Sequence, residues 1–191
     1  AFHILKKNGL LIFDDIDINK KDGEFTPIEA IDEILKSIDV QIHINQKESQ
    51  FWGKKYDVFS LNYGGDIISL GNTEIKSLHT PGHTPGSTCY YVGNKLIAGD
   101  TLFVFGCGRC DLHGGNPEEM YHTLKDIKNN LNNDTIILPG HDYSVKKTCT
   151  MHEQITGNPF MHFENKKDFI NYRMVTHDRI RQSPYDAIIK P

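Results

Sequence analysis

The sequence predicts a mixed α/β or α+β fold, in which hairpin strands and crossover helices build packed layers. Two hairpins are indicated by strand-like runs on either side of turn residues, DIISL-GN-TEIKSLH in residues 66–79 and STCYYV-GN-KLIAGD in residues 87–100. Capped amphipathic helices stand between other strand-like runs. With 191 residues, of which 38% are hydrophobic, the chain is long enough for one domain with a sizeable core.

The first third of the chain reads as strand, loop, helix and strand. Leu10–Ile18 has the composition of a strand, and the loop NKKDGEFT follows it. Thr26 then caps a helix of residues 27–38, which has Pro27 at its first position. Val40–Ile44 alternates between apolar and polar residues, as a strand with one buried face does.

Two helices and a strand are expected in the C-terminal half. Asn116 caps a helix that begins with Pro117 and runs to about Asn129. The run DTIILPGHDY reads as a strand that ends in a loop at His141. A last helix, within residues 166–182, should direct its apolar positions inward. Those positions are Phe169, Tyr172, Val175 and Ile180.

Composition excludes several classes of protein. The net charge of −4 provides no basic surface for nucleic acid or an anionic membrane. No apolar run approaches a transmembrane helix, and the first residues, AFHILKKNG, lack the apolar core of a signal peptide. Four cysteines are too few for a disulfide scaffold, so we expect a reducing compartment, either the cytoplasm or an organellar matrix. The CGRC of residues 107–110 is interpreted as buried thiols, because no second CxxC completes a zinc site.

Three polar residues stand at the same kind of place, directly after a predicted strand. His83 follows the strand that ends near Leu78, Asp100 ends KLIAGD, and His141 ends DTIILPGH. Residues at strand ends on one edge of a sheet can converge although they are distant in sequence. Two imidazoles and one carboxylate suit zinc, iron or manganese, so these residues are candidate metal ligands.

Four motifs carry a resemblance to a known family. HTPGHTPGS, LIAGDTLF, GCGRCDLHGGNPEEMYHTL and DTIILPGHDY resemble the metallo-β-lactamase superfamily, most closely its glyoxalase II and persulfide dioxygenase branch. The resemblance implies an αββα sandwich with metals held by loops at one edge. It further implies a single domain over residues 1–191, with a sandwich core in 1–145 and a C-terminal helical extension in 146–191.

The resemblance also assigns roles to residues. It implies that His83 is a metal ligand, that Asp100 bridges two metals, and that His141 binds the second metal. The metals of hydrolytic members polarise a carbonyl and supply hydroxide, whereas dioxygenase members hold one iron with two histidines and the Asp. By similarity, Arg109 and Asp111 belong to a structural loop beside the site, where they form a local salt bridge or contact substrate.

One motif of the family is missing. The sequence contains no His-x-His-x-Asp-His string, and lysines, Asp22 and Glu24 stand in the loop where the histidines are expected. Asp22 or Glu24 could substitute as an oxygen ligand, or both are solvated turn residues. The chain before this loop is also short, so we expect the opening strands of the first sheet to be absent. The sheet edge they would cover predicts a homo-oligomer or a hetero-complex.

The sequence is compatible with three functions. The first is a degenerate or incomplete member, a pseudoenzyme with a partial site for at most one zinc or iron and weak or no catalysis. The second is a metal-dependent hydrolase of the glyoxalase II type, or a mononuclear iron enzyme like the persulfide dioxygenases. The third is a fragment or split form whose missing strands come from another chain or from a segment outside this sequence. A thioester substrate follows from analogy alone.

Overall fold

A computed structural model describes the backbone of residues 2–3, 12–13, 43–45, 60–62, 67–70 and 72–189, and the side chains of Ile67 and residues 72–189. The predicted helix of residues 27–38 lies outside the described residues, as does the loop that contains Asp22 and Glu24. The absence of the family's opening strands therefore stays a prediction.

The described residues form a mixed α/β structure, as the sequence predicts. The strands are β1 (Phe2–His3), β2 (Ile12–Phe13), β3 (His43–Asn45), β4 (Ser60–Asn62), β5 (Ile67–Leu70), β6 (Thr73–His79), β7 (Thr88–Val92), β8 (Lys95–Gly99), β9 (Leu102–Phe103), β10 (Gly106–Cys107), β11 (Ile136–Pro139) and β12 (Cys149–Thr150). The helices are α3 (Pro117–Asn130), α4 (Met151–Gly157), the 3-10 helix η1 (Pro159–Met161), α5 (Lys166–Asn171), the π-helix η2 (Tyr172–Thr176) and α6 (His177–Ile180). No helix among the described residues is long and apolar enough to cross a membrane.

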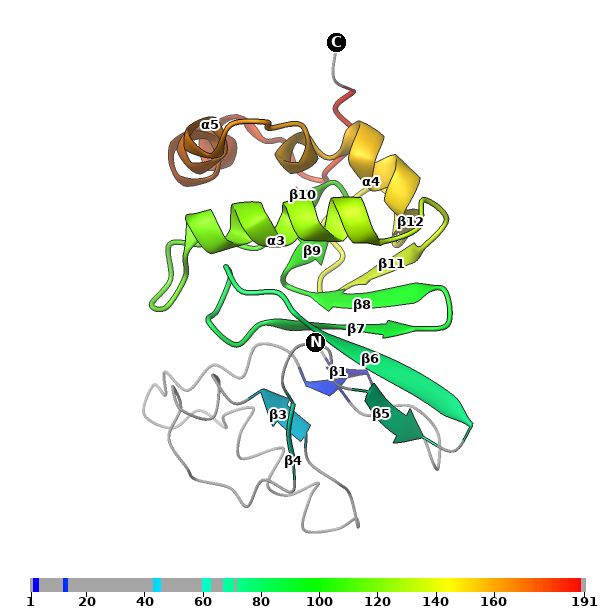
Figure 1. The fold of residues 1–191 in the computed structure, drawn as a ribbon. Helices are drawn as coiled ribbons and strands as arrows, with labels where there is room; N and C mark the ends of the chain where they lie inside the picture. The colour runs from blue at the N-terminus through cyan, green and yellow to red at the C-terminus, as the bar shows by residue number, and fades with distance from the viewer. Residues whose placement is uncertain are drawn as a thin grey trace, which may run out of the picture.

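A six-stranded sheet in the order β12-β11-β8-β7-β6-β5 dominates the described fold (Figure 1). Both predicted hairpins are confirmed. β5 and β6 pair antiparallel with Leu70 opposite Thr73, and β7 and β8 pair with Val92 opposite Lys95. Gly93 in the second turn has a φ of 57°, a conformation that glycine adopts without steric cost. β8 and β11 run parallel, so their carboxyl ends meet at one edge of the sheet.

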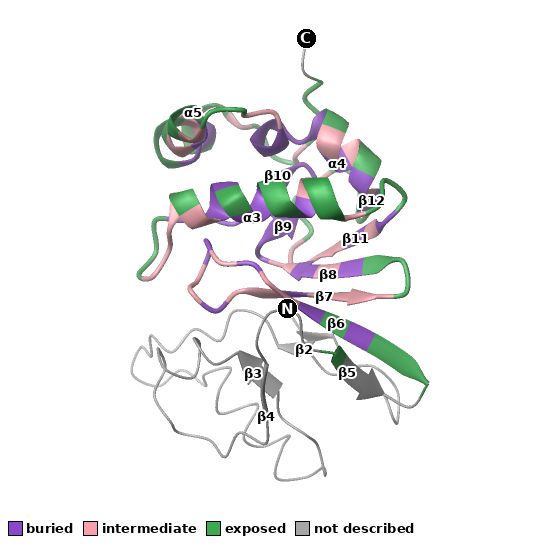
Figure 2. Cartoon of the chain, in the orientation of Figure 1, coloured by how far each residue is buried: buried purple, intermediate pink, exposed green. Residues whose placement is uncertain are grey.

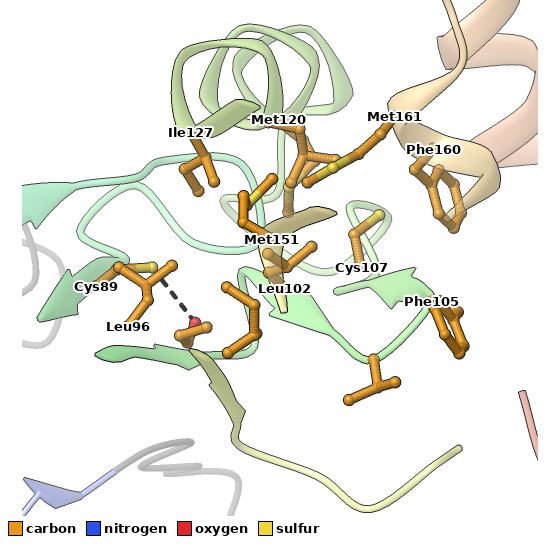
Figure 3. Close-up of a cluster of buried hydrophobic side chains, with 14 of the residues drawn as sticks. Cys89, Leu96, Leu102, Phe105, Cys107, Met120, Ile127, Met151, Phe160 and Met161 are labelled. Atoms are coloured by element: carbon orange, nitrogen blue, oxygen red, sulfur yellow. Dashed lines mark hydrogen bonds between the residues drawn. The ribbon is translucent and has the colours of Figure 1, made fainter. Parts of the chain in front are cut away.

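Helix α3 covers one face of this sheet, and its predicted cap is confirmed. The Asn116 side chain accepts hydrogen bonds from the backbone N–H groups of Glu118 and Glu119. Buried and exposed residues mix along α3, as expected for a helix with one covered face (Figure 2). The core contains apolar side chains of the strands and of α3 (Figure 3). They include Cys89, Leu96, Leu102, Ile137, Met120, Leu124 and Ile127.

The C-terminal segment packs against this core and also contributes a strand to the sheet. β12 pairs antiparallel with β11, and helix α4 follows it directly. Met151 of α4, Phe160 of η1 and Phe169 of α5 belong to the same core as α3. The predicted extension of residues 146–191 is therefore continuous with the sheet rather than separate from it.

Two inward positions predicted for the last helix are wrong. Phe169 is fully buried as predicted, but Val175 is 46% exposed and Ile180 is 61% exposed. The π-helical turn η2 is the physical reason, because an i→i+5 turn holds more residues than an α-turn and rotates the following side chains to new faces. Arg173 and His177 take the buried positions instead.

A capping box opens helix α4. The Thr150 hydroxyl accepts from the Glu153 N–H, and the Glu153 carboxylate accepts from the Thr150 N–H. We expect Thr150→Ala to lower the free energy of unfolding by about 1 kcal/mol, because the Glu153 N–H at the helix start loses its acceptor. Urea unfolding measures the loss. Thr156→Ala, on an exposed position of the same helix, is the matched control, and an equal loss in both variants would contradict the capping argument.

Candidate functional site

The structure brings the three candidate ligands together around Asp100. His83 Nε2 lies 3.5 Å from Asp100 Oδ2, and His141 Nε2 lies 3.2 Å from Asp100 Oδ1. Each imidazole therefore faces its own oxygen of one carboxylate. The side chains of His83 and Asp100 are each 8% exposed, whereas that of His141 is 30% exposed, so solvent reaches the group from the His141 side.

Parallel pairing of β8 and β11 places Asp100 beside His141. The strands lie in register from Ile136 opposite Lys95 to Pro139 opposite Gly99. The Gly140 N–H donates to the Gly99 carbonyl at 3.0 Å and ties the two strand ends together. Asp100 and His141 come immediately after this contact, so the sheet sets the distance between them.

Helix α3 holds the loop that carries His83. The Asn116 N–H donates to the Gly82 carbonyl at 2.8 Å, and the Thr123 hydroxyl donates to the Pro81 carbonyl at 2.7 Å. Gly82 has a φ of 140°, and a Cβ built on it would lie 2.5 Å from the Met120 Cα. The Pro-Gly sequence before His83 thus allows the loop to lie directly against the helix backbone.

A backbone contact orients the His83 ring. Nδ1 lies 2.8 Å from the carbonyl oxygen of Arg109, and because a carbonyl only accepts, Nδ1 carries the hydrogen. Nε2 then presents its lone pair toward Asp100, which is the usual arrangement of a metal-binding histidine. Gly108 permits this approach, since a Cβ there would lie 2.1 Å from the Asp100 carbonyl oxygen and 3.1 Å from the His83 ring.

Arg109 and Asp111 form the local salt bridge that was one of their two sequence-based interpretations. Arg109 Nε donates to Asp111 Oδ1 at 2.8 Å, and Nη2 donates to Oδ2 at 2.6 Å. The hydrogen bond from Arg109 lowers the pKa of Asp111 to about 2. Both side chains are about half exposed, so the pair fixes the shape of the loop more than it stabilises the fold.

The interpretation of the CGRC as buried thiols is confirmed. All four cysteines are free and buried. Burial raises the pKa of Cys110 to about 12 and raises the pKa of Cys107 far above its usual range. Both groups are neutral thiols at physiological pH, whereas a metal ligand or a nucleophile has to be a thiolate. We therefore assign these cysteines to packing behind the His83 loop.

Aromatic side chains surround His141. Its ring stacks on Tyr143 with centroids 4.9 Å apart and an interplanar angle of 11°, and Phe103 contacts it edge-on at 5.7 Å. Tyr143 is 44% exposed, so an aromatic face borders the accessible side of the group. No sequence motif marks Tyr143 or Phe103 as a site residue, although Tyr143 follows His141 by two residues in the same loop.

Each of the two His–Asp100 pairs has the donor chemistry and the N–O spacing of two ligands on one metal ion. Nitrogen and oxygen ligands roughly 2.0–2.2 Å from one tetrahedral zinc lie about 3.4 Å from each other. The two observed N–O separations, 3.5 and 3.2 Å, are close to that spacing and longer than an ordinary hydrogen bond of about 2.9 Å. As they stand, no three or more His, Cys, Asp or Glu side chains among the described residues are grouped to hold a metal ion. The role of His83, Asp100 and His141 as ligands therefore stays a prediction.

Comparison with known families agrees with this fold and with the motifs that build the site. The sequence profile of the metallo-beta-lactamase superfamily matches residues 29–141, which include His83, Asp100 and His141. This chain belongs to the metallo-β-lactamase superfamily.

Relatives within the superfamily lie in the branch that the motifs predict. A probable polyketide biosynthesis zinc-dependent hydrolase of Bacillus subtilis is 29% identical over 79% of this chain and 67% of its own length. A probable hydroxyacylglutathione hydrolase of Encephalitozoon cuniculi is 37% identical over 52% of this chain and 47% of its own length. The chain thus spans about half the length of that hydrolase, as it does for the Dictyostelium discoideum hydroxyacylglutathione hydrolase, of which it covers 43%.

Solved structures of the superfamily share the fold. ETHE1 from Myxococcus xanthus superposes with a TM-score of 0.68 at 26% identity, over 76% of this chain and 62% of that protein. A metallo-beta-lactamase from Staphylococcus aureus has the same TM-score and identity, over 76% of this chain and 47% of that protein. The metallo-β-lactamase fold predicted from the motifs is confirmed.

Proposed function

We propose that this chain is a metal-binding member of the superfamily with a partial site, which holds at most one zinc or iron through His83, Asp100 and His141. Its catalysis, as this chain, is weak or absent. The convergence of two imidazoles on the two oxygens of one buried carboxylate carries the proposal. A second metal would need further protein ligands, and the sequence lacks the histidine string that supplies them in the family.

The residues around such a site would have different roles. Asp100 provides the negative charge, and the Arg109 carbonyl keeps the His83 proton on Nδ1, so Nε2 offers its lone pair to a cation. His141 lies on the accessible side, between the site and the exposed Tyr143. A bound zinc or iron would act as a Lewis acid that polarises a carbonyl oxygen of the substrate.

A metal-dependent hydrolase of the hydroxyacylglutathione hydrolase type is the second candidate function. The names of the Encephalitozoon and Dictyostelium relatives favour it, as does the zinc-dependent hydrolase of Bacillus. Full activity would require the missing ligands to come from residues such as Asp22 and Glu24, or from another chain. The two candidates differ in the number of metals per chain and in turnover.

Metal analysis separates these candidates. We expect at most one equivalent of zinc or iron in the wild type, lost readily to a chelator, and none in His83→Ala, Asp100→Ala or His141→Ala. Two donors alone hold zinc poorly against water, whereas a core of this size does not depend on the ion for folding. Elemental analysis and melting curves in chelator make the measurement. Two tightly held metals, or metal retained in all three variants, would overturn the proposed site.

Turnover is measured on the same proteins. The wild type should hydrolyse S-lactoylglutathione no faster than His83→Ala, because a site with few protein ligands does not fix the coordination that hydrolysis needs. Zinc-dependent turnover well above the His83→Ala control would favour the hydrolase over the partial site. Circular dichroism of each variant confirms that lost binding does not reflect lost folding.

A further inference from the structure

We infer that two buried amides of the C-terminal segment, Gln154 and Asn158, position the candidate metal ligands Asp100 and His83 by holding the hairpin between Asp100 and Arg109. The inference rests on the proposed metal site. It gives residues 146–191 a role in the geometry of that site, although none of the three candidate ligands lies in this segment.

The hairpin connects both sides of the site. β9 begins two residues after Asp100, and β10 ends two residues before Arg109, whose carbonyl orients His83. The strands pair antiparallel, with Leu102 opposite Cys107 and Phe103 opposite Gly106. A change in the turn would therefore move the Asp100 carboxylate and the His83 acceptor relative to each other.

The turn of this hairpin has an unfavourable backbone. Phe105 has a φ of 58°. Among the described residues, it is the one residue other than glycine with a positive φ. A bulky side chain in this left-handed region is strained and persists only where surrounding contacts fix it. Figure 3 shows Phe105 at this turn and Cys107 on the following strand, with Phe160 of the C-terminal segment nearby.

Gln154 supplies contacts that fix the turn. Its Nε2 donates to the Phe103 carbonyl at 2.7 Å, and its Oε1 accepts from the Phe105 N–H at 3.2 Å. A primary amide is suited to this place because it donates and accepts at once. The Gln154 side chain is fully buried, so no water replaces these bonds when they are lost.

Asn158 and Arg181 complete the set. Asn158 Nδ2 donates to the Gly106 carbonyl at 3.1 Å and to Gln154 Oε1 at 2.9 Å, and Asn158 is also fully buried. Arg181 Nη2 donates to the Phe105 carbonyl at 2.9 Å. Three side chains from after α3 thus bind four backbone groups of the hairpin.

The capping box of α4 provides a way to separate positioning from stability. Thr150 and Glu153 bond to each other's backbone at the start of the helix, and none of their recorded contacts reaches the hairpin. Thr150→Ala therefore weakens α4 while leaving the contacts of Gln154 in place. Gln154→Met keeps the size of the side chain and removes its hydrogen bonds.

The first measurement needs no metal. In NMR spectra of the chelator-treated protein, we expect Gln154→Met to expose the Phe105 amide to fast hydrogen exchange and to shift or broaden the His83 Nδ1–H resonance. Thr150→Ala should leave the His83 resonance in place. An unchanged His83 resonance in Gln154→Met would overturn the inference. Failure of the wild type to bind zinc would refute the proposed site but leave this test decisive.

Zinc affinity is the second measurement. Loss of residues that orient ligands typically weakens metal binding by about 10- to 100-fold, and we expect a loss of that size in Gln154→Met but not in Thr150→Ala. Arg181→Met removes one bond to the turn, along with a bond to the Asp186 carbonyl, and should give a smaller loss of the same kind. If Gln154→Met does not fold, Arg181→Met tests whether the hairpin contacts position the ligands. Wild-type affinity and an unchanged His83 resonance in Arg181→Met would then contradict the inference.

Discussion

Gly82→Ala is expected to lower the free energy of unfolding by about 3 kcal/mol or more, because strain and overlap act together. The φ of 140° at Gly82 is one that L-residues rarely adopt. The added methyl would lie 2.5 Å from the Met120 Cα and 2.6 Å from its backbone nitrogen, inside helix α3. Since a helix backbone yields little, the loop that carries His83 would have to move away, and metal binding should fall with stability.

Gly93→Ala is the matched control for this variant. It makes the same chemical change at another positive φ, 57°, but nothing lies within 4 Å of the added methyl. Only the conformational cost of about 1–2 kcal/mol should appear, without any effect on the metal site. Urea unfolding compares the two variants. Equal losses would mean that contact with α3 does not matter, and the explanation of the Pro-Gly loop given above would be wrong.

Much of this fold could be predicted because its signals are local. The hairpin turns at residues 71–72 and 93–94 and the cap at Asn116 each depend on a few neighbouring residues. The meeting of Asp100 and His141 could be anticipated as well, since both follow strands and parallel neighbours end at the same edge. Their identity as ligands is a further step, which the metal analysis tests.

Other features depend on contacts that leave no pattern in the sequence. The bond from His83 to the Arg109 carbonyl joins a side chain to a backbone group 26 residues away. Gln154 reaches the Phe103 carbonyl across 51 residues. Any residue type has a backbone carbonyl, so neither partner could be recognised from its identity. In the sequence, a buried amide residue such as Gln154 cannot be distinguished from an exposed polar residue of a helix.

The inward positions predicted for the last helix are partly wrong for a related reason. A periodicity of 3.6 residues assumes one helix type throughout, and it correctly placed Phe169 in the core. The π-turn η2 interrupts that periodicity, so Val175 and Ile180 face solvent while Arg173 enters the core. Arg173 bonds there to His177 and Asp178, a polar cluster that a hydrophobic pattern does not predict.

Phe169→Ala is expected to produce one of the largest losses of stability in the chain, about 3–5 kcal/mol, as for other fully buried phenylalanines. Phe169 has no exposed surface, and its ring makes edge contacts with Tyr121 of α3 and with Phe160 at 5.5 and 5.8 Å. Because Phe169 of α5 belongs to the same core as α3, and β12 joins the sheet, the C-terminal segment should unfold together with the rest of the chain.

The measurement is urea unfolding, followed by far-UV circular dichroism and by the near-UV circular dichroism of aromatic side chains other than tryptophan. We expect one transition in the wild type and one in Phe169→Ala, shifted to lower urea by the full loss. Val175→Ala is the control in the same segment, and its 46% exposure predicts a change within about 0.5 kcal/mol. Two separate transitions would show that residues 146–191 form an independent unit. In that case the sheet could be folded while residues 146–191 are unfolded, and Gln154 and Asn158 would then no longer hold the hairpin between Asp100 and Arg109. The single-domain prediction and the positioning of the site therefore depend on the same cooperative core.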